Sequence, residues 1–141
     1  ETNKMLEGIL SVAGKSGLYK LLSQGKNMIV VESIEDGKRS PVSSNARVSA
    51  LQEISMYTVD GDVKLSRVMA NIYKHTGGKQ CLTAKSSAEE LKQFMADVLP
   101  EWDSERIYVS DIKKLVTWYN LLVDKGLVSD KEDETNEENA E

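Results

Sequence analysis

The chain has 141 residues, of which 40% are hydrophobic and 29% charged, the balance of a globular protein and not of a disordered one. Its longest apolar run, 28–31, is far shorter than the roughly 20 residues that a membrane-spanning helix needs, so we expect no membrane contact. The formal net charge is −5. The single cysteine, Cys81, excludes an intrachain disulfide, and we see no export signal, so we expect a cytoplasmic protein.

Residues 5–62 show short strand patterns separated by turns about every 8–12 residues, which is typical of small barrels and sandwiches. This stretch predicts an SH3-like β-barrel, with a helical turn at 49–53 before its last strand. Asp36-Gly37 predicts a two-residue type I′ hairpin turn. Pro41 places its strand at an edge, because proline has no backbone N–H. The expected strands are 17–23, 28–34, 38–42 and 54–58.

Residues 63–126 carry apolar side chains at helical spacing and predict a three-helix domain. Gly77-Gly78 ends the first helix, Ser87 and Glu90 form a capping box for the second, and Ser110 caps the third. The buried stripes are expected to be Leu65, Val68, Met69, Ile72 and Tyr73, then Leu91, Phe94, Met95, Val98 and Leu99, then Ile112, Leu115, Val116, Tyr119, Leu122 and Val123.

Residues 127–141 contain seven acids and one base, so this stretch has a net charge of −6 while the rest of the chain is +1. So polar a stretch buries too little apolar surface to offset the entropy of ordering it. The sequence therefore predicts a fold of the α+β class, made of a barrel, a helical domain and a disordered acidic tail.

Two motifs bear on catalysis. Gly14-Lys15-Ser16 resembles the end of a phosphate-binding loop, but the first glycine of that pattern is missing, so a tight turn that enters a strand is favoured. His75 and Cys81 are the sole histidine and cysteine, and nothing places a base, its orienting partner and oxyanion donors around them. We expect no enzyme, no metal site and no cofactor. An enzyme that uses His75 and Cys81 is kept as the third alternative.

The basic residues of the first domain raise the possibility of nucleic-acid binding, because small barrels often bind it with basic loops. Five acids accompany six bases between residues 5 and 58, so a mixed, solvated surface is favoured over an RNA site. The candidate nucleic-acid-binding residues are Lys20, Lys26, Lys38 and Arg39.

Trp118 flanks the apolar stripe of the third predicted helix. A tryptophan there packs helices together, and an exposed one marks a surface for a protein partner. We therefore expect a non-enzymatic binding or adaptor module whose partner is a protein, with Trp118 as its candidate surface. RNA binding through the four basic residues is the alternative.

Several segments resemble a family of short bacterial proteins of unknown function found in the Bacteroidetes lineage. The resemblance covers about 6–126, and it implies a barrel-like N-terminal part followed by a helical part. It implies no catalytic residues. The segments that carry it are 6–24, 30–34, 36–39, 106–114 and 118–122.

Overall fold

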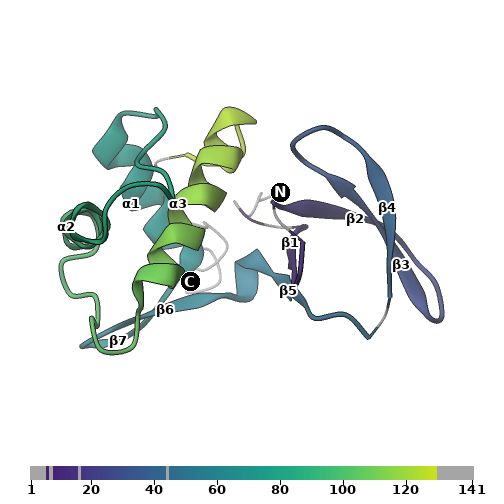
Figure 1. The fold of residues 1–141 in the computed structure, drawn as a ribbon, viewed down its shortest axis with the longest axis horizontal. Coiled ribbons are helices and arrows are strands. Elements are labelled where there is room, and N and C mark those ends of the chain that lie inside the picture. The colour runs from purple at the N-terminus through teal and green to yellow at the C-terminus, as the bar shows by residue number, and fades with distance from the viewer. Residues whose placement is uncertain (1–5, 7, 16, 44, 130–141) are drawn as a thin grey trace, which may run out of the picture.

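The computed structural model describes residues 6, 8–15, 17–43 and 45–129 (Figure 1). In this part of the chain, seven strands come before three α-helices. The strands are β1 (Ile9–Val12), β2 (Tyr19–Gln24), β3 (Met28–Ser33), β4 (Arg39–Ser43), β5 (Val48–Ala50), β6 (Ser55–Thr58) and β7 (Gly61–Lys64). A 3₁₀ turn, Leu51–Glu53, joins β5 to β6, and the helices are α1 (Leu65–Thr76), α2 (Ala88–Val98) and α3 (Val109–Asp124). The α+β class is thus confirmed.

Five strands form one antiparallel sheet in the order β4-β3-β2-β1-β5. The prediction of a closed barrel is wrong, because β4 and β5 are edge strands that do not pair with each other in the described residues. The expected last strand of the barrel, 54–58, pairs instead with β7 in a separate two-stranded sheet. Pro41 lies in the edge strand β4, as its missing N–H requires.

The β6–β7 and β3–β4 hairpins each use a glycine with a positive φ angle, but the β3–β4 turn is not of the type that the sequence predicts. Gly61 has φ +130° and closes the short β6–β7 turn, where the Thr58 hydroxyl donates to the Gly61 carbonyl. In the β3–β4 turn the φ angle is positive at Gly37 but not at Asp36, so the predicted type I′ turn is wrong. The Asp36 carboxylate instead accepts a hydrogen bond from the Lys38 N–H.

The three predicted helices are confirmed, and two of their ends follow the expected chemistry. Gly77 has φ +71° after the last turn of α1, and Ser87 and Glu90 form the expected capping box of α2. The predicted cap of α3 is wrong by two residues. Tyr108, not Ser110, precedes the helix, and its N–H donates to the Asp111 carboxylate at 2.9 Å.

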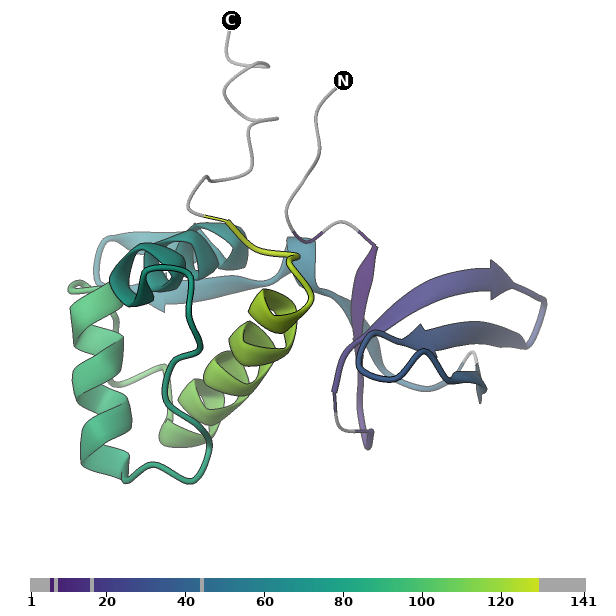
Figure 2. The ribbon, with the colours of Figure 1, turned by 90° about the horizontal axis from the view of Figure 1, so that it is seen from above.

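One continuous core joins the helices to the start of the large sheet. Leu6, Ile9, Leu18 and Leu51 pack into the same cluster as the buried helix stripes. Figure 2 shows the helices on one side of the molecule and the large sheet on the other. A smaller cluster of Val12, Val31 and Val42 lies within the sheet. No described helix combines the length and apolar character needed to cross a bilayer.

The boundary of the predicted acidic tail needs correction. Leu127 and Val128 pack against the main core, and Val128 is buried. These two residues therefore belong to the folded part of the chain and not to a disordered tail. The rest of the predicted tail, 130–141, lies outside the described residues.

Candidate functional site

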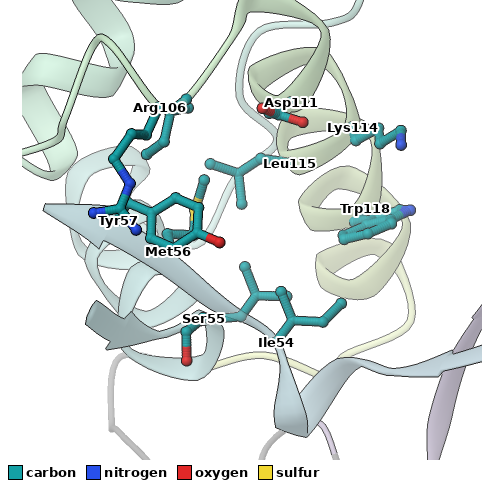
Figure 3. Close-up of a pocket in the computed structure, with 11 residues that line it drawn as sticks. Ile54, Ser55, Met56, Tyr57, Arg106, Asp111, Lys114, Leu115 and Trp118 are labelled. Carbon is teal, nitrogen blue, oxygen red and sulfur yellow. The ribbon is translucent and has the colours of Figure 1, made fainter. Parts of the chain in front are cut away.

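A pocket of about 210 Å³ lies between β6 and α3 (Figure 3). Its apolar wall combines residues that are far apart in the sequence. They come from β6 and the residue before it, from the start of α1, and from α3 with the loop that precedes it. These residues are Ile54, Met56, Leu65, Ile107, Leu115 and Trp118.

Helix periodicity explains why α3 contributes a whole wall of this pocket. Asp111, Lys114, Leu115 and Trp118 follow the i, i+3, i+4, i+7 spacing that places side chains on one face of a helix. Leu115 is buried. Trp118 is half-buried, and only part of its side chain packs against the core. The exposed part of this face is therefore apolar next to polar groups, as binding pockets commonly are.

The edge of β6 beside the pocket is only partly paired. Thr58 forms an isolated antiparallel bridge with Trp102, in which the Val59 N–H donates to the Glu101 carbonyl and the Asp103 N–H donates to the Tyr57 carbonyl. The chain then leaves this edge, because the Asp103 carbonyl accepts from Arg106 and Ile107 at the start of a turn.

Antiparallel pairing alternates, so every second residue of β6 points its backbone groups away from β7. Ile54 accepts from the Leu65 N–H on the β7 side, and Tyr57 accepts from Asp103 on the other side. Ser55 shares the side of Tyr57. In the described part of the chain, the Ser55 backbone and the Tyr57 N–H have no hydrogen-bond partner on this side. An edge that can accept a further strand therefore runs along the pocket.

The rim of the pocket is polar and charged. The Arg106 guanidinium carbon lies 3.8 Å from the centre of the Tyr57 ring, a cation–π contact. Across the pocket, Lys114 is exposed on α3 (Figure 3). The Asp111 carboxylate accepts from the Tyr108 N–H and sits in the first turn of α3, where the helix dipole favours a negative charge.

Of the residues predicted as sites from the sequence, Trp118 lines this pocket. The four basic residues do not form one patch. Lys26 lies in the β2–β3 turn and Lys38 in the β3–β4 turn, so the six residues of β3 separate them by about 20 Å.

The other two basic candidates flank an acid. Lys20 pairs across the sheet with Glu32, and Glu32 pairs with Arg39, whose guanidinium Nε lies 3.9 Å from the Glu32 carboxylate. Glu35 and Asp36 follow in the next turn. The interleaved acids weaken the electrostatic argument for RNA, and RNA binding stays a prediction of the sequence.

His75 and Cys81 lie in different surroundings, since His75 is exposed and Cys81 is partly buried. His75 is exposed on α1, where its ring packs edge-on against Phe94 with centroids 5.7 Å apart. The shallow depression that His75 lines does not include Cys81. Burial raises the pKa of the Cys81 thiol to about 12, so the reactive thiolate is scarce at neutral pH. The enzyme alternative stays a prediction of the sequence.

The remaining polar contacts of Cys81 are structural. Its N–H donates to the Asn120 side chain at 2.8 Å, and the amide nitrogen of Asn120 donates to the Leu82 carbonyl at 2.9 Å. These bonds fix the loop before α2 against α3. Among the described residues, no group of three or more His, Cys, Asp or Glu side chains is placed to hold a metal ion.

Sequence reasoning missed Ser55, Tyr57 and Arg106 as site residues. The sequence pattern predicts 54–58 as the last strand of a closed barrel, and closure would leave it no open edge. Arg106 lies in a loop, and no local pattern links it to Tyr57, 49 positions earlier in the chain. These residues become a site only through the packing of α3 beside β6.

Comparison with known proteins divides the chain into two matched parts. Residues 6–51 match a domain of unknown function, DUF5606, and residues 54–122 match a second one, DUF6852. The first match contains the large sheet, and the second contains the β6–β7 hairpin and nearly all of the helices. The division at 62/63 that the sequence suggested stays a prediction.

A solution NMR structure of a protein from Bacteroides vulgatus, determined by a structural genomics consortium, has the same fold with a TM-score of 0.75. It is 44% identical to this chain, and the alignment covers 92% of this chain and 94% of the other. No match was found among curated proteins. The chain therefore belongs to the same family as the Bacteroides vulgatus protein, a Bacteroidetes-type family that combines these two domains of unknown function.

Proposed function

We propose that this protein is a non-enzymatic binding module, and that it binds an extended segment of a partner protein along the open edge of β6. This refines the expectation of a protein-binding site at Trp118. The observation that carries the proposal is that, in the described part of the chain, the Ser55 backbone and the Tyr57 N–H have no hydrogen-bond partner beside the apolar pocket.

The edge supplies affinity through main-chain hydrogen bonds. A peptide that adds as a strand bonds to every second residue of the strand it joins, here to the N–H and carbonyl of Ser55 and to the N–H of Tyr57. The protein's own segment at Glu101–Asp103 already uses this edge in the same way, next to the open stretch. A partner strand would extend that pairing without any change in β6 or β7.

The pocket supplies selectivity through side chains. Successive side chains of an added strand alternate between its two faces, so one in two would point toward Leu115 and Trp118. A volume of about 210 Å³ is below the range of about 300–1,000 Å³ that is usual for small-molecule sites. The pocket fits a single large apolar side chain better than a cofactor.

In this proposal the binding site lies on β6, outside the large sheet. We infer that it is an open relative of the SH3-like barrels, because five short antiparallel strands follow one another and β2 carries an irregularity between Leu21 and Ser23 that bends a strand. Such small sheets commonly serve in binding, an argument from fold alone. We expect the interaction to occur in the cytoplasm, where the free Cys81 stays reduced.

A displayed library of random nonapeptides, selected on the immobilised full chain, tests the proposal. Selected peptides are synthesised and titrated by calorimetry against the protein and two variants. We expect Trp118→Ala to weaken binding at least about tenfold, because the anchor side chain loses its wall. Thr117→Ala, which changes the neighbouring exposed residue outside the pocket, is the matched control and should bind like the unaltered protein. Equal binding by the Trp118→Ala variant, or a failure of the library to yield any binder, would contradict the proposal.

A further inference from the structure

The charged groups at the pocket are not balanced. Arg106, Asp111 and Lys114 line it, so cations outnumber anions by two to one. The anion is also the better compensated charge. Asp111 accepts the Tyr108 N–H at 2.9 Å and lies at the positive end of the α3 dipole. The rim therefore presents positive charge to a ligand.

Neither cation is neutralised by the fold. In the described part of the chain, no ion pair involves Arg106 or Lys114. Arg106 lies over the face of the Tyr57 ring, and this contact holds the guanidinium without using its in-plane N–H donors. A guanidinium that is held in place, with free donors in its plane, suits a two-point contact with a carboxylate.

Arg106 and Lys114 approach the pocket from different elements of the fold. Figure 3 shows Arg106 and Tyr57 on one side of the pocket and Lys114 on the α3 side, with Leu115 between them. A strand added to β6 would run next to Arg106, and Lys114 would lie on the α3 side of the pocket that its apolar side chain enters.

We propose, on the basis of the function proposed above, that the bound segment is acidic. It places one large apolar side chain against Leu115 and Trp118, and it presents Asp or Glu side chains next to that anchor to Arg106 and Lys114. The partner is thus a segment of another protein in which an apolar residue is flanked by carboxylates.

The chain's own C-terminal residues fit this description only in part. Residues 130–141 hold seven acids, but none of their side chains is larger and more apolar than that of Ala140. They offer charge without an anchor for the pocket. This difference favours a second protein as the source of the segment.

Synthetic nonapeptides test the charge preference directly. Each peptide has Leu or Phe at its centre, and the positions on either side carry Glu, the isosteric Gln, or Lys. Binding is measured by fluorescence polarisation at low and at moderate salt. We expect the Glu peptides to bind about tenfold more tightly than the Gln peptides, with a preference that shrinks as salt rises.

Variants of the protein assign the preference to the two cations. Arg106→Gln and Lys114→Gln should each reduce the Glu-over-Gln ratio, while the affinity for the Gln peptides stays within about twofold. Arg106→Lys keeps the charge without the planar group and should retain part of the ratio. Lys113→Gln is the control, since Lys113 neighbours Lys114 on α3 but does not line the pocket.

The outcomes separate the two proposals. If Glu and Gln peptides bind equally well, the acidic preference is wrong but docking on β6 stands. If no peptide of the set binds, both proposals fail. Tight binding of a synthetic peptide of residues 130–141, lost in the Arg106→Gln variant, would overturn the assignment to a second protein and identify the chain's own C-terminal segment as the occupant.

Discussion

Thr58 and Trp102 are joined by an isolated antiparallel bridge, although they are 44 positions apart in the sequence. The bridge shows that the outer edge of β6 already pairs with a segment from elsewhere in the chain. Because the Glu101–Asp103 segment turns away after two hydrogen bonds, the rest of the edge stays open beside the Trp118 pocket.

Ser55→Pro should abolish peptide binding with little loss of stability. The Ser55 N–H points away from β7, so its removal leaves the β6–β7 hydrogen bonds intact but takes away a donor for an added strand. The preceding residue, Ile54, has φ −82° and ψ 139°, an extended conformation that is allowed before proline.

We expect a change of about 1 kcal/mol or less in the free energy of unfolding of the Ser55→Pro variant, measured in urea. Ser55→Ala keeps the N–H and is the matched control in the binding assay. A Ser55→Pro variant that folds and binds peptides as tightly as Ser55→Ala would rule out strand addition at β6.

Tyr119→Phe should destabilise the protein by about 1–2 kcal/mol. The Tyr119 hydroxyl donates to the Lys79 carbonyl at 2.9 Å and lies 2.8 Å from the Thr76 hydroxyl, so it ties the end of α1 to α3. Its loss leaves these groups short of a partner in a half-buried place. Tyr108→Phe, which alters an exposed ring, should change the urea midpoint far less. Equal midpoints for the two variants would contradict the structural role of this hydroxyl.

Two neighbouring glycines should differ in their tolerance of alanine. Gly77 and Gly78 have φ angles of +71° and +83°, so an alanine at either position costs about 1 kcal/mol or more in backbone strain. A Cβ atom at Gly77 would meet nothing within 4 Å, whereas at Gly78 it would lie 3.0 Å from the Tyr73 ring. Thermal unfolding should therefore show a larger loss for Gly78→Ala than for Gly77→Ala. The reverse order would contradict the packing of Tyr73 against this turn.

The stability of the protein should fall with rising pH in part through Cys81. Desolvation raises the pKa of its thiol from 9.0 to about 12 in the folded state. Since the unfolded thiol loses its proton first, the stabilisation is complete below pH 9 and is lost progressively as the pH approaches 12.

In Cys81→Ala, the free energy of unfolding should decline less steeply above pH 9 than in the unaltered protein. Both are measured in urea under reducing conditions across the same pH range. Parallel pH profiles of the two proteins would show that Cys81 is not desolvated in the folded state.

Much of the fold follows from local sequence. The stripe from Leu65 to Tyr73 and the Ser87–Glu90 capping box predict helices correctly, because residues within a turn or two of each other decide helix formation. The patterns at 28–34 and 54–58 also predict strands, and β3 and β6 lie there. They do not predict which strands pair, because a strand pattern does not specify its partner.

The sequence by itself determined the α+β class and the positions of the three helices. Only the tertiary structure decided that β6 joins β7 instead of closing a barrel, and that Arg106 lies over Tyr57 beside Trp118. The physical reason is the separation along the sequence of the residues that must come into contact. Helices and caps depend on neighbours along the chain, whereas sheet edges and pockets depend on contacts between segments that only the packing of the whole core brings together.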